Sequence, residues 1–344
     1  MALINEILAR RMAMPAYDTQ LWTFMARANG RNLRNISDDA LQERLNRIDR
    51  NIQYLDSSVT PRDDLPAERG WLSPWWWLRI RHWTVLEFEH RGLTPGPTPT
   101  IPALPALASD FKGVVAGGRK LLVRISAKVW SLELLQRGRL RFAPATSYRD
   151  AALGGARADD EMSKAYHRPG QVLKITGPRG EFITPIGDVE FATIRSIERR
   201  GVLYDVPYWL CSFSSDLDPR LFTEFPSGHL DGDACLVIFD PMAFVQRALP
   251  HLIQAAPRAT KKLFPIEYFD LYHPAEKRLS LLIAKEMPYA YQREMRFALD
   301  PEGGSPLAGG DALFVEIGSI EDIAAVYAPF GAKLAGTGPD SFLA

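Results

Sequence analysis

Two spacings of apolar residues divide the chain near residue 93. Before that point apolar residues recur at intervals of three and four, the pattern of helices with one buried face. The pattern predicts helices over 2–13 and 17–29. A further helix is expected to begin after Ser37, a favourable N-cap, and to bury one stripe: Leu41, Leu45, Ile48, Ile52 and Leu55.

The stretch 73–92 has the clearest helix boundaries in the chain. Ser73 is a favourable N-cap, Pro74 suits the first helical position and Gly92 suits the end. Packing between the helical region and the rest of the protein explains the tryptophans of this helix better than an exposed patch that binds a partner. These tryptophans are Trp75, Trp76, Trp77 and Trp83.

A proline-rich stretch, 94–111, follows the helical region. Its prolines exclude a helix and favour an extended, semi-rigid tether. After it, short apolar or alternating runs predict mostly antiparallel strands with a few helices between them. We therefore predict an α+β fold with three parts: a helical N-terminal domain over 1–93, a linker over 94–111, and an α+β domain over 112–344.

Turn and cap signals mark the elements of the third part. A helix over 131–138 has Ser131 as its cap and Gly138 as its end, and two more helices are expected over 241–256 and 275–284. The expected strands are 119–126, 139–143, 171–177, 180–187, 191–197, 201–206, 208–215, 234–240, 263–272, 288–299, 312–318 and 323–331.

Polar residues interrupt the expected strand 288–299. Side chains alternate along a strand, so Gln292 and Glu294 are expected to point the same way. The ordinary interpretation is a half-exposed strand in which Glu294 pairs with a neighbouring arginine. The alternative is a polar strand face that is turned into a cleft.

Two further apolar strands carry aligned polar side chains. Arg124 and Ser126 share one face of the strand 119–126, and Ser212 and Ser214 share one face of the strand 208–215. Each has an ordinary explanation as a surface residue or a small filler. Together with the Gln-x-Glu pair, they can form three walls of one polar cleft.

Composition narrows the class of protein. Lysine plus arginine equals aspartate plus glutamate at 41 each, so the total charge does not indicate a strongly basic nucleic-acid binder. Two cysteines and scattered histidines, without ligand spacing, indicate a reducing compartment and no metal site. We expect a cytoplasmic protein without a secretory signal or membrane span.

The order arginine, Ser-x-Ser, Gln-x-Glu resembles the Arg–Ser–Glu class of mono-ADP-ribosyltransferases. The resemblance implies a split antiparallel sheet whose cleft binds NAD as substrate, with Arg124 on a phosphate and Ser212 shaping the nicotinamide pocket. It implies that Ser214 braces the catalytic Glu294, which stabilises the oxocarbenium-like state as nicotinamide leaves, while Gln292 orients the acceptor. The implied cofactor-binding set also includes Ser126, Phe213 and Tyr148.

Roughly residues 120–300 are also similar to a family of uncharacterised bacterial domains related to the transferase fold. Members often carry an aromatic–Asn–Asp–Pro stretch where this chain reads SYRDA, so Tyr148 and Asp150 match. Many members have histidine at the position of Arg124. Residues 1–110 lie outside both resemblances.

The resemblance implies a toxin, secreted effector or anti-phage factor, either cytoplasmic or delivered into a target cell, whose helical region controls or targets it. The expected partners are a protein or nucleic-acid acceptor and a cognate inhibitor or antitoxin; Gln292, in place of a second glutamate, argues against arginine as the acceptor. Lys261, Lys262 and Lys285 fit either a route for an anionic acceptor or a solvated face. Two alternatives stay open: an inactive module that binds a nucleotide or partner, and a phosphotransferase acting on RNA ends.

Overall fold

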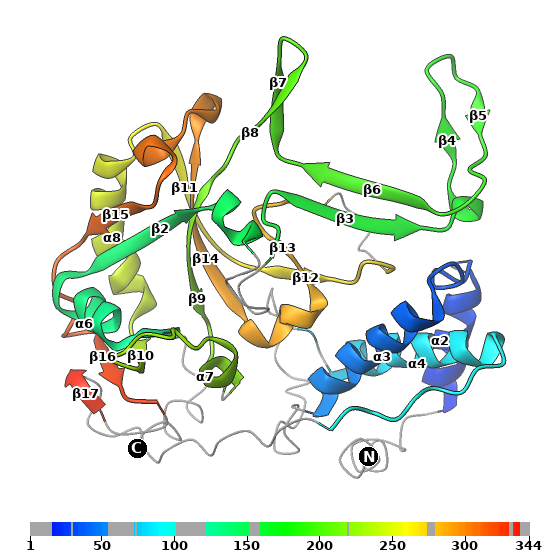
Figure 1. Cartoon of the computed structure of the whole chain (residues 1–344), viewed down its shortest axis with the longest axis horizontal. Coiled ribbons are helices and arrows are strands. Elements are labelled where there is room, and N and C mark those ends of the chain that lie inside the picture. The colour runs from blue at the N-terminus through cyan, green and yellow to red at the C-terminus, as the bar shows by residue number, and fades with distance from the viewer. Residues whose placement is uncertain are drawn as a thin grey trace.

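The computed structural model has both helices and antiparallel sheets, so the fold belongs to the α+β class (Figure 1). In Figure 1 the first described helices lie at one end of the molecule and a large sheet lies at the other. The expected helix over 2–13 and most of the expected linker lie outside the described residues. The structure describes residues 16–28, 30–53, 72, 74–100, 121–150, 159–218, 220–273, 279–329 and 333–337.

The described helices of the N-terminal region are α2 (Ala16–Ala28), α3 (Asp38–Gln53) and α4 (Pro74–His90). Helix α3 begins where the sequence predicts, because the Ala40 amide donates a hydrogen bond to the Ser37 hydroxyl at 3.2 Å. Gly92 follows the end of α4 with a φ of 68°. The expected α3 stripe is buried at Leu41, Leu45, Ile48 and Ile52, while Leu55 and Ser73 lie outside the described residues.

The tryptophans of α4 lie at the boundary between the helices and the remainder. Trp77 and Trp83 are buried, and Trp76 packs against the same cluster. This cluster joins residues of α3 and α4 to residues from the second half of the chain: Ile266, Tyr268, Met287 and Ala290. The expected packing role is therefore confirmed for these three tryptophans. The side chain of Trp75 lies outside the described residues.

The large sheet has antiparallel pairing along its whole described path. Strand β9 lies between β14 and β1, so the strands that carry the three candidate motifs are neighbours. In spatial order the strands are β11 (Ala259–Pro265), β14 (Glu294–Pro301), β9 (Trp209–Ser214), β1 (Leu122–Ala127), β10 (Asp233–Ile238), β16 (Ala324–Tyr327) and β17 (Lys333–Gly336).

This sheet divides along one edge of β9. At the end of β9, Ser214 pairs with Val123 of β1, whereas the first two residues of β9 pair with the last two of β2 (Arg139–Pro144). Among the described pairs, none joins residues 211–213 to β1 or β2. Strand β2 carries β15 (Leu313–Glu316) on its other side, so the sheet has two branches that diverge from β9.

Helices cover both faces of the large sheet. Helices α6 (Lys128–Arg137) and α8 (Pro241–Ala255) pack on the face that carries Phe213 and Phe297, and α7 (Arg220–Glu224) packs on the other face. Asp240 caps α8 by accepting a hydrogen bond from the Ala243 amide at 2.9 Å.

The expected start of the helix α6 is wrong by one turn. The helix begins at Lys128, directly after β1, and Ser131 is a buried residue inside it. The Ser131 hydroxyl lies 2.8 Å from that of Ser126, so its polar group is satisfied by a side chain and not by a cap. The predicted end is confirmed, since Gly138 adopts a φ of 61°.

Three hairpins extend along one side of the molecule, at the top of Figure 1. They confirm the expected hairpin character of residues 171–206, and their first strand, β3, was not expected. The pairs are β3 (Ser163–Arg168) with β6 (Val189–Ile194), β4 (Ile175–Thr176) with β5 (Phe182–Ile183), and β7 (Ser196–Arg199) with β8 (Val202–Asp205).

Two short parallel strands, β12 (Glu267–Phe269) and β13 (Ala284–Glu286), lie between the large sheet and the helices. The expected helix over 275–284 is wrong in its described part, because residues 281–283 form a turn that leads into β13. The remaining short helices are 3-10 turns: η1 (Ala145–Arg149), η3 (Gly170–Val172), η4 (Met287–Gln292), η5 (Glu302–Gly304) and η6 (Leu307–Gly310). None of the described helices combines the length and the apolar character that a membrane crossing needs.

Candidate functional site

The candidate site begins where η4 meets β14. The expected strand over 288–299 is wrong in its first half, because residues 287–292 form the 3-10 helix η4. Pro288 has no N–H for a strand ladder, and Arg293 turns the chain with a φ of 42°. Strand β14 therefore starts at Glu294, and the turn, not strand alternation, places Gln292 near it.

Glu294 receives donors from three segments of the chain. Ser212 of β9 donates its hydroxyl to Glu294 Oε1 at 2.6 Å, and Arg296 donates Nε to the same oxygen at 2.8 Å. Lys285 of β13 donates Nζ to Glu294 Oε2 at 3.1 Å. The expected pairing with an arginine is thus confirmed, but the expected half-exposed position is wrong: the Glu294 side chain is only 6% exposed.

A second carboxylate completes the cluster from a different part of the chain. The guanidinium of Arg296, which is fully buried, donates from Nη2 and Nη1 to the two oxygens of Glu161 at 2.8 and 2.9 Å. The Tyr208 hydroxyl also donates to Glu161 at 3.1 Å. Tyr268 accepts the backbone N–H of Glu294 at 2.9 Å, so the start of β14 is held at its backbone as well as its side chain.

The charged neighbours in the cluster stabilise the ionised forms of Glu294 and Lys285. Burial by itself raises the pKa of Glu294, but Arg296 and Lys285, together with the hydrogen bonds from Arg296 and Ser212, outweigh burial and hold that pKa well below its usual range. Burial lowers the pKa of Lys285, but the carboxylates of Glu294, Asp159 and Glu161 raise it above its usual value. Glu294 is consequently an ionised carboxylate and Lys285 an ammonium at neutral pH.

Lys285 differs from the solvated lysine that its sequence context favoured. It is buried, and its ammonium also donates to the side-chain oxygen of Gln292 at 2.9 Å. Lys262 on β11 is exposed, as a solvated face predicts. Lys285 therefore links Gln292 and Glu294, the two residues that the sequence singled out.

The two serines of β9 have different roles from those that the resemblance implies. Ser212, and not Ser214, braces Glu294. The Ser214 hydroxyl instead lies 2.6 Å from the carbonyl of Gln292 and 2.7 Å from that of Asp216, so it fixes the backbone of the turn before β14. The expected contact of Ser214 with the Glu294 carboxylate is wrong. The strand register pairs Ser214 with Glu294, but its hydroxyl is taken by backbone carbonyls, and the carboxylate instead meets Ser212, which lies opposite Arg296 two pairs along.

Arg124 lies at the point where the sheet divides. Its guanidinium donates to Cys211 Sγ at 2.8 Å and lies 5.6 Å from the centre of the Phe213 ring. Cys211 and Phe213 point to the face of β9 opposite Ser212. Arg124 therefore meets β9 from the other side, in the gap where residues 211–213 have no described partner on that edge.

Tyr148 connects these two groups. It follows β2 in η1 and packs in a cluster with Tyr208 and Leu210. Burial raises the pKa of Tyr148 to about 12, with Arg124 acting to lower it and Glu294 to raise it further. Its hydroxyl thus lies within electrostatic range of both candidate residues. No described contact joins Ser126 to this group, since its hydroxyl is engaged by Ser131.

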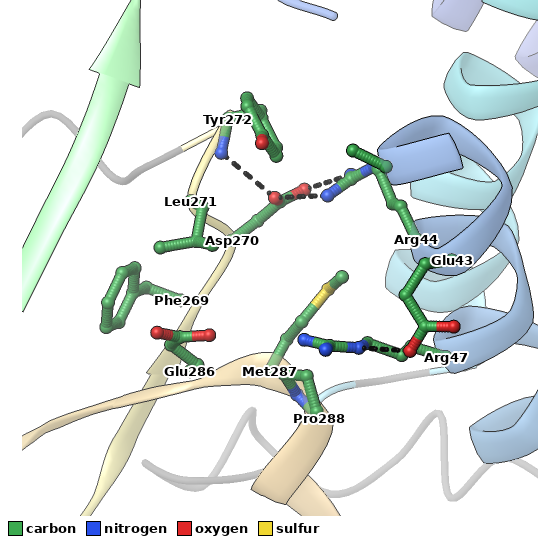
Figure 2. A pocket seen from close by; sticks show the side chains of 11 residues that line it. Glu43, Arg44, Arg47, Phe269, Asp270, Leu271, Tyr272, Glu286, Met287 and Pro288 are labelled. Atoms are coloured by element: carbon green, nitrogen blue, oxygen red, sulfur yellow. Dashed lines mark hydrogen bonds and ion pairs between the residues drawn. The ribbon is translucent and has the colours of Figure 1, made fainter. Parts of the chain in front are cut away.

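The two described cavities lie away from these residues. The larger, about 160 Å³, lies between α3 and the β12–η4 segment, and Figure 2 shows its lining. The other is about 20 Å³ and lies between α4 and the loop that contains His273. Arg124, Ser212 and Glu294 line neither.

Sequence reasoning missed several members of the cluster. Arg296 shares the alternating face of Glu294 and could have been found from that pattern. Lys285 was named for an acceptor route or a solvated face, and its pairing with Glu294 was not expected. Tyr208 shares the alternating face of Ser212 and Ser214 and carried the same signal. Glu161 had no comparable signal, because only the fold brings the turn before β3 to β14.

No protein-family model, curated protein or solved structure matches this chain. A buried, ionised and rigidly oriented carboxylate beside a hydroxyl is suited to stabilise developing positive charge. A guanidinium at a gap in the sheet is suited to bind phosphate.

Proposed function

We propose that the protein is a mono-ADP-ribosyltransferase that uses NAD as substrate and transfers ADP-ribose to a protein or nucleic-acid acceptor. In this proposal the large sheet, with its two branches diverging from β9, is the split sheet of the transferase class. Nucleotide enters at the divergence, beside Arg124 and Tyr148.

One observation carries the proposal. The arginine, the Ser-x-Ser and the glutamate lie on three adjacent strands, β1, β9 and β14, and the first serine is hydrogen-bonded to the glutamate at 2.6 Å. These motifs are distant along the chain, with Ser212 and Glu294 82 positions apart, and they lie on neighbouring strands of the sheet. Arg124 contacts the face of β9 opposite Ser212, so the proposal places the phosphate in the gap between the two branches.

The proposed roles follow from the charges. Arg124 binds a phosphate of NAD, and Tyr148 borders the same entry. Glu294, held ionised and oriented by Ser212, Arg296 and Lys285, stabilises the positive charge that develops on the ribose as nicotinamide leaves. Gln292, held by Lys285, contacts the acceptor.

The direct test is release of nicotinamide from labelled NAD by the wild type and by Glu294→Gln. Glutamine keeps the shape but removes the charge, so the initial rate is expected to fall by about 10²-fold or more. Glu316→Gln, which changes an exposed carboxylate on β15, is the matched control and should keep the wild-type rate. Circular dichroism of each variant shows whether it remains folded.

Equal rates in a folded Glu294→Gln and the wild type would falsify the assigned role of Glu294. Arg124→Met gives an independent reading, because it removes the proposed phosphate contact without touching the Glu294 cluster. Its expected effect is weaker binding of NAD, measured by calorimetry.

A second function is favoured by the burial of Glu294. Both carboxylate oxygens are in ion pairs and the side chain is almost fully covered, which suits a module of the same fold that binds nucleotide without turnover. Wild-type protein that binds NAD but releases no nicotinamide in the presence of candidate acceptors supports this function over transfer.

A further inference from the structure

The cavity in Figure 2 is formed by three segments that are distant in the sequence. Helix α3 contributes one wall, the end of β12 and the loop after it contribute a second, and the β13–η4 junction contributes the third.

Four of the five charged side chains that line the cavity neutralise one another in pairs. Arg44 donates to both oxygens of Asp270, at 2.7 and 2.5 Å, and Arg47 donates to Glu43 at 2.8 Å. These bonds are drawn in Figure 2. The fifth, Glu286, makes no hydrogen bond or ion pair with any residue in the part of the chain that the structure describes.

Glu286 is also in an environment that disfavours an isolated charge. It is half-buried beside Phe269 and Met287, which are both buried, and Figure 2 shows its carboxylate next to the Phe269 ring. Burial, followed by the charge of Asp159, raises its pKa above the usual value, while Lys164 and Arg47 lower it. A carboxylate so placed gains from a cation that reaches it.

The size of the cavity limits what can enter. At about 160 Å³ it is smaller than the ~300–1,000 Å³ of pockets that enclose a drug-sized ligand, so a dinucleotide does not fit. The remaining lining is largely apolar or aromatic, with Leu271, Tyr272 and Pro288 beside the buried residues already named. Such walls suit an alkyl stem, and an aromatic ring suits a cationic head.

We propose that this cavity binds one alkyl guanidinium or alkyl ammonium group, with Glu286 as its counter-ion and the aromatic wall around its stem. The group comes either from an arginine or lysine side chain of a partner polypeptide or from a free small amine. The site stands apart from the proposed transferase activity, because Arg124, Ser212 and Glu294 do not line the cavity and cation binding there needs no NAD.

The test is a titration of the full-length chain with butylguanidinium and with a blocked Ala-Arg-Ala peptide, followed by saturation-transfer NMR. The peptide in which citrulline replaces arginine is the neutral, near-isosteric control. Both cations are expected to bind and the citrulline peptide to bind at least about 10-fold more weakly. Tighter binding of the arginine peptide than of butylguanidinium identifies a polypeptide as the source, and equal binding identifies a free small cation.

Two variants locate the site. Glu286→Gln is expected to weaken binding of both cations by about 10-fold or more, because it removes the lining carboxylate that has no partner among the described residues. Glu43→Gln removes a carboxylate from the same cavity that is exposed and already paired with Arg47, and it should leave affinity within about twofold. Equal affinity of wild type and a folded Glu286→Gln, or equal binding of the citrulline and arginine peptides, overturns the proposal. Because the readout is binding without NAD, its failure is distinct from failure of the transferase.

Discussion

Two buried carboxylates, Asp270 and Glu294, each form an ion pair with an arginine, but they differ in the number and kind of their other partners. Asp270 is bound by one guanidinium, that of Arg44, and by the backbone amide of Tyr272 at 3.1 Å. Glu294 is bound by a hydroxyl, a guanidinium and an ammonium from three segments, and its arginine is shared with Glu161.

The difference distinguishes an ion pair that only connects two elements from a candidate functional site. The Arg44–Asp270 pair connects α3 to the segment after β12, and each charge has the other as its one ion-pair partner among the described residues. In the Glu294 cluster, by contrast, the charged groups share several partners. These partners orient the carboxylate as well as neutralise it. A pair that only joins two elements can be replaced by apolar groups, whereas an oriented carboxylate cannot be replaced without losing its chemistry.

The largest expected effect comes from removing the shared cation. Arg296→Met leaves Glu161 and Glu294 buried without their guanidinium, and it should lower the free energy of unfolding by about 3–5 kcal/mol. Urea denaturation followed by tryptophan fluorescence measures it. A loss below about 1 kcal/mol is incompatible with Arg296 as the main counter-ion of the cluster.

Removing one partner of the Arg44–Asp270 pair is expected to have a somewhat smaller effect. Asp270→Asn leaves Arg44 charged and buried, although Thr84 and the ring of Tyr272 still contact its guanidinium. The free energy of unfolding should fall by about 3 kcal/mol, the lower end of the range for a broken buried pair.

The double variant Arg44→Met/Asp270→Leu is the control for that comparison. Apolar replacement of both members should restore stability to within about 1 kcal/mol of the wild type and leave nicotinamide release unchanged. If the double variant is as unstable as Asp270→Asn, the pair does more than connect α3 to the segment after β12.

As pH falls, the region around Asp270 and His273 should lose stability first and the Glu294 cluster second. Burial, with Arg44, Arg79 and Arg168, lowers the pKa of His273 to about 3, while Asp270 opposes that shift. The unfolded chain therefore binds more protons than the folded one as pH falls below about 6.5, and stability should decline by about 1.4 kcal/mol per pH unit. Glu294, whose pKa is lowered on folding, adds a further loss only below its ordinary value of 4.5.

Urea midpoints measured from pH 7 to pH 4 test this order. His273→Gln should flatten the decline between about pH 6.5 and 4.5 and leave the steeper loss below it. An unchanged slope in the upper window of the variant rules out His273 as its source.

The smallest expected change in stability comes from the brace itself. Ser212→Ala removes one hydrogen bond but leaves Glu294 paired with Arg296 and Lys285, so the free energy of unfolding should fall by about 1 kcal/mol. If the proposed transferase activity holds, nicotinamide release should fall by more than that change in stability accounts for, because the carboxylate loses orientation. If Ser212→Ala keeps both the wild-type rate and the wild-type stability, Ser212 is only a small filler residue.

Local sequence signals predicted the presence of helices and strands better than they predicted those helix and strand ends that depend on tertiary contacts. The cap at Ser37 and the end at Gly138 are as expected, because a side-chain cap and a left-handed glycine are specified by the residue type at that position. Ser131 has the composition of a cap but pairs with Ser126, which is five residues away and becomes its neighbour only when the helix follows β1 directly. The alternation over 288–299 suggested one strand, yet Pro288 and the turn at Arg293 interrupt it.

The candidate site shows the same limit. Its residues on β1, β9 and β14 were identified by type and order, and Ser212 with Glu294 meet as the strand order requires. The exchange of roles between Ser212 and Ser214 was not predictable. The register pairs Ser214 with Glu294, but the turn before β14 takes the Ser214 hydroxyl with its backbone carbonyls. Glu161 was missed because nothing near it in the chain indicates Arg296 as its partner.

The amino-acid sequence by itself determined the α+β class, the amphipathic helices at the start and most strands of the large sheet. These depend on apolar periodicity, caps and turn residues, which act over a few positions. Only the tertiary structure decided that Glu294 is buried and ion-paired, that Arg124 lies at a division of the sheet, and that Glu286 faces a cavity against α3. The ion-pair partners of Glu294 are close in the chain, but Glu161, which shares Arg296 with it, is 135 positions from that arginine. Burial depends on such distant segments, and no local pattern specifies which of many charged residues will meet.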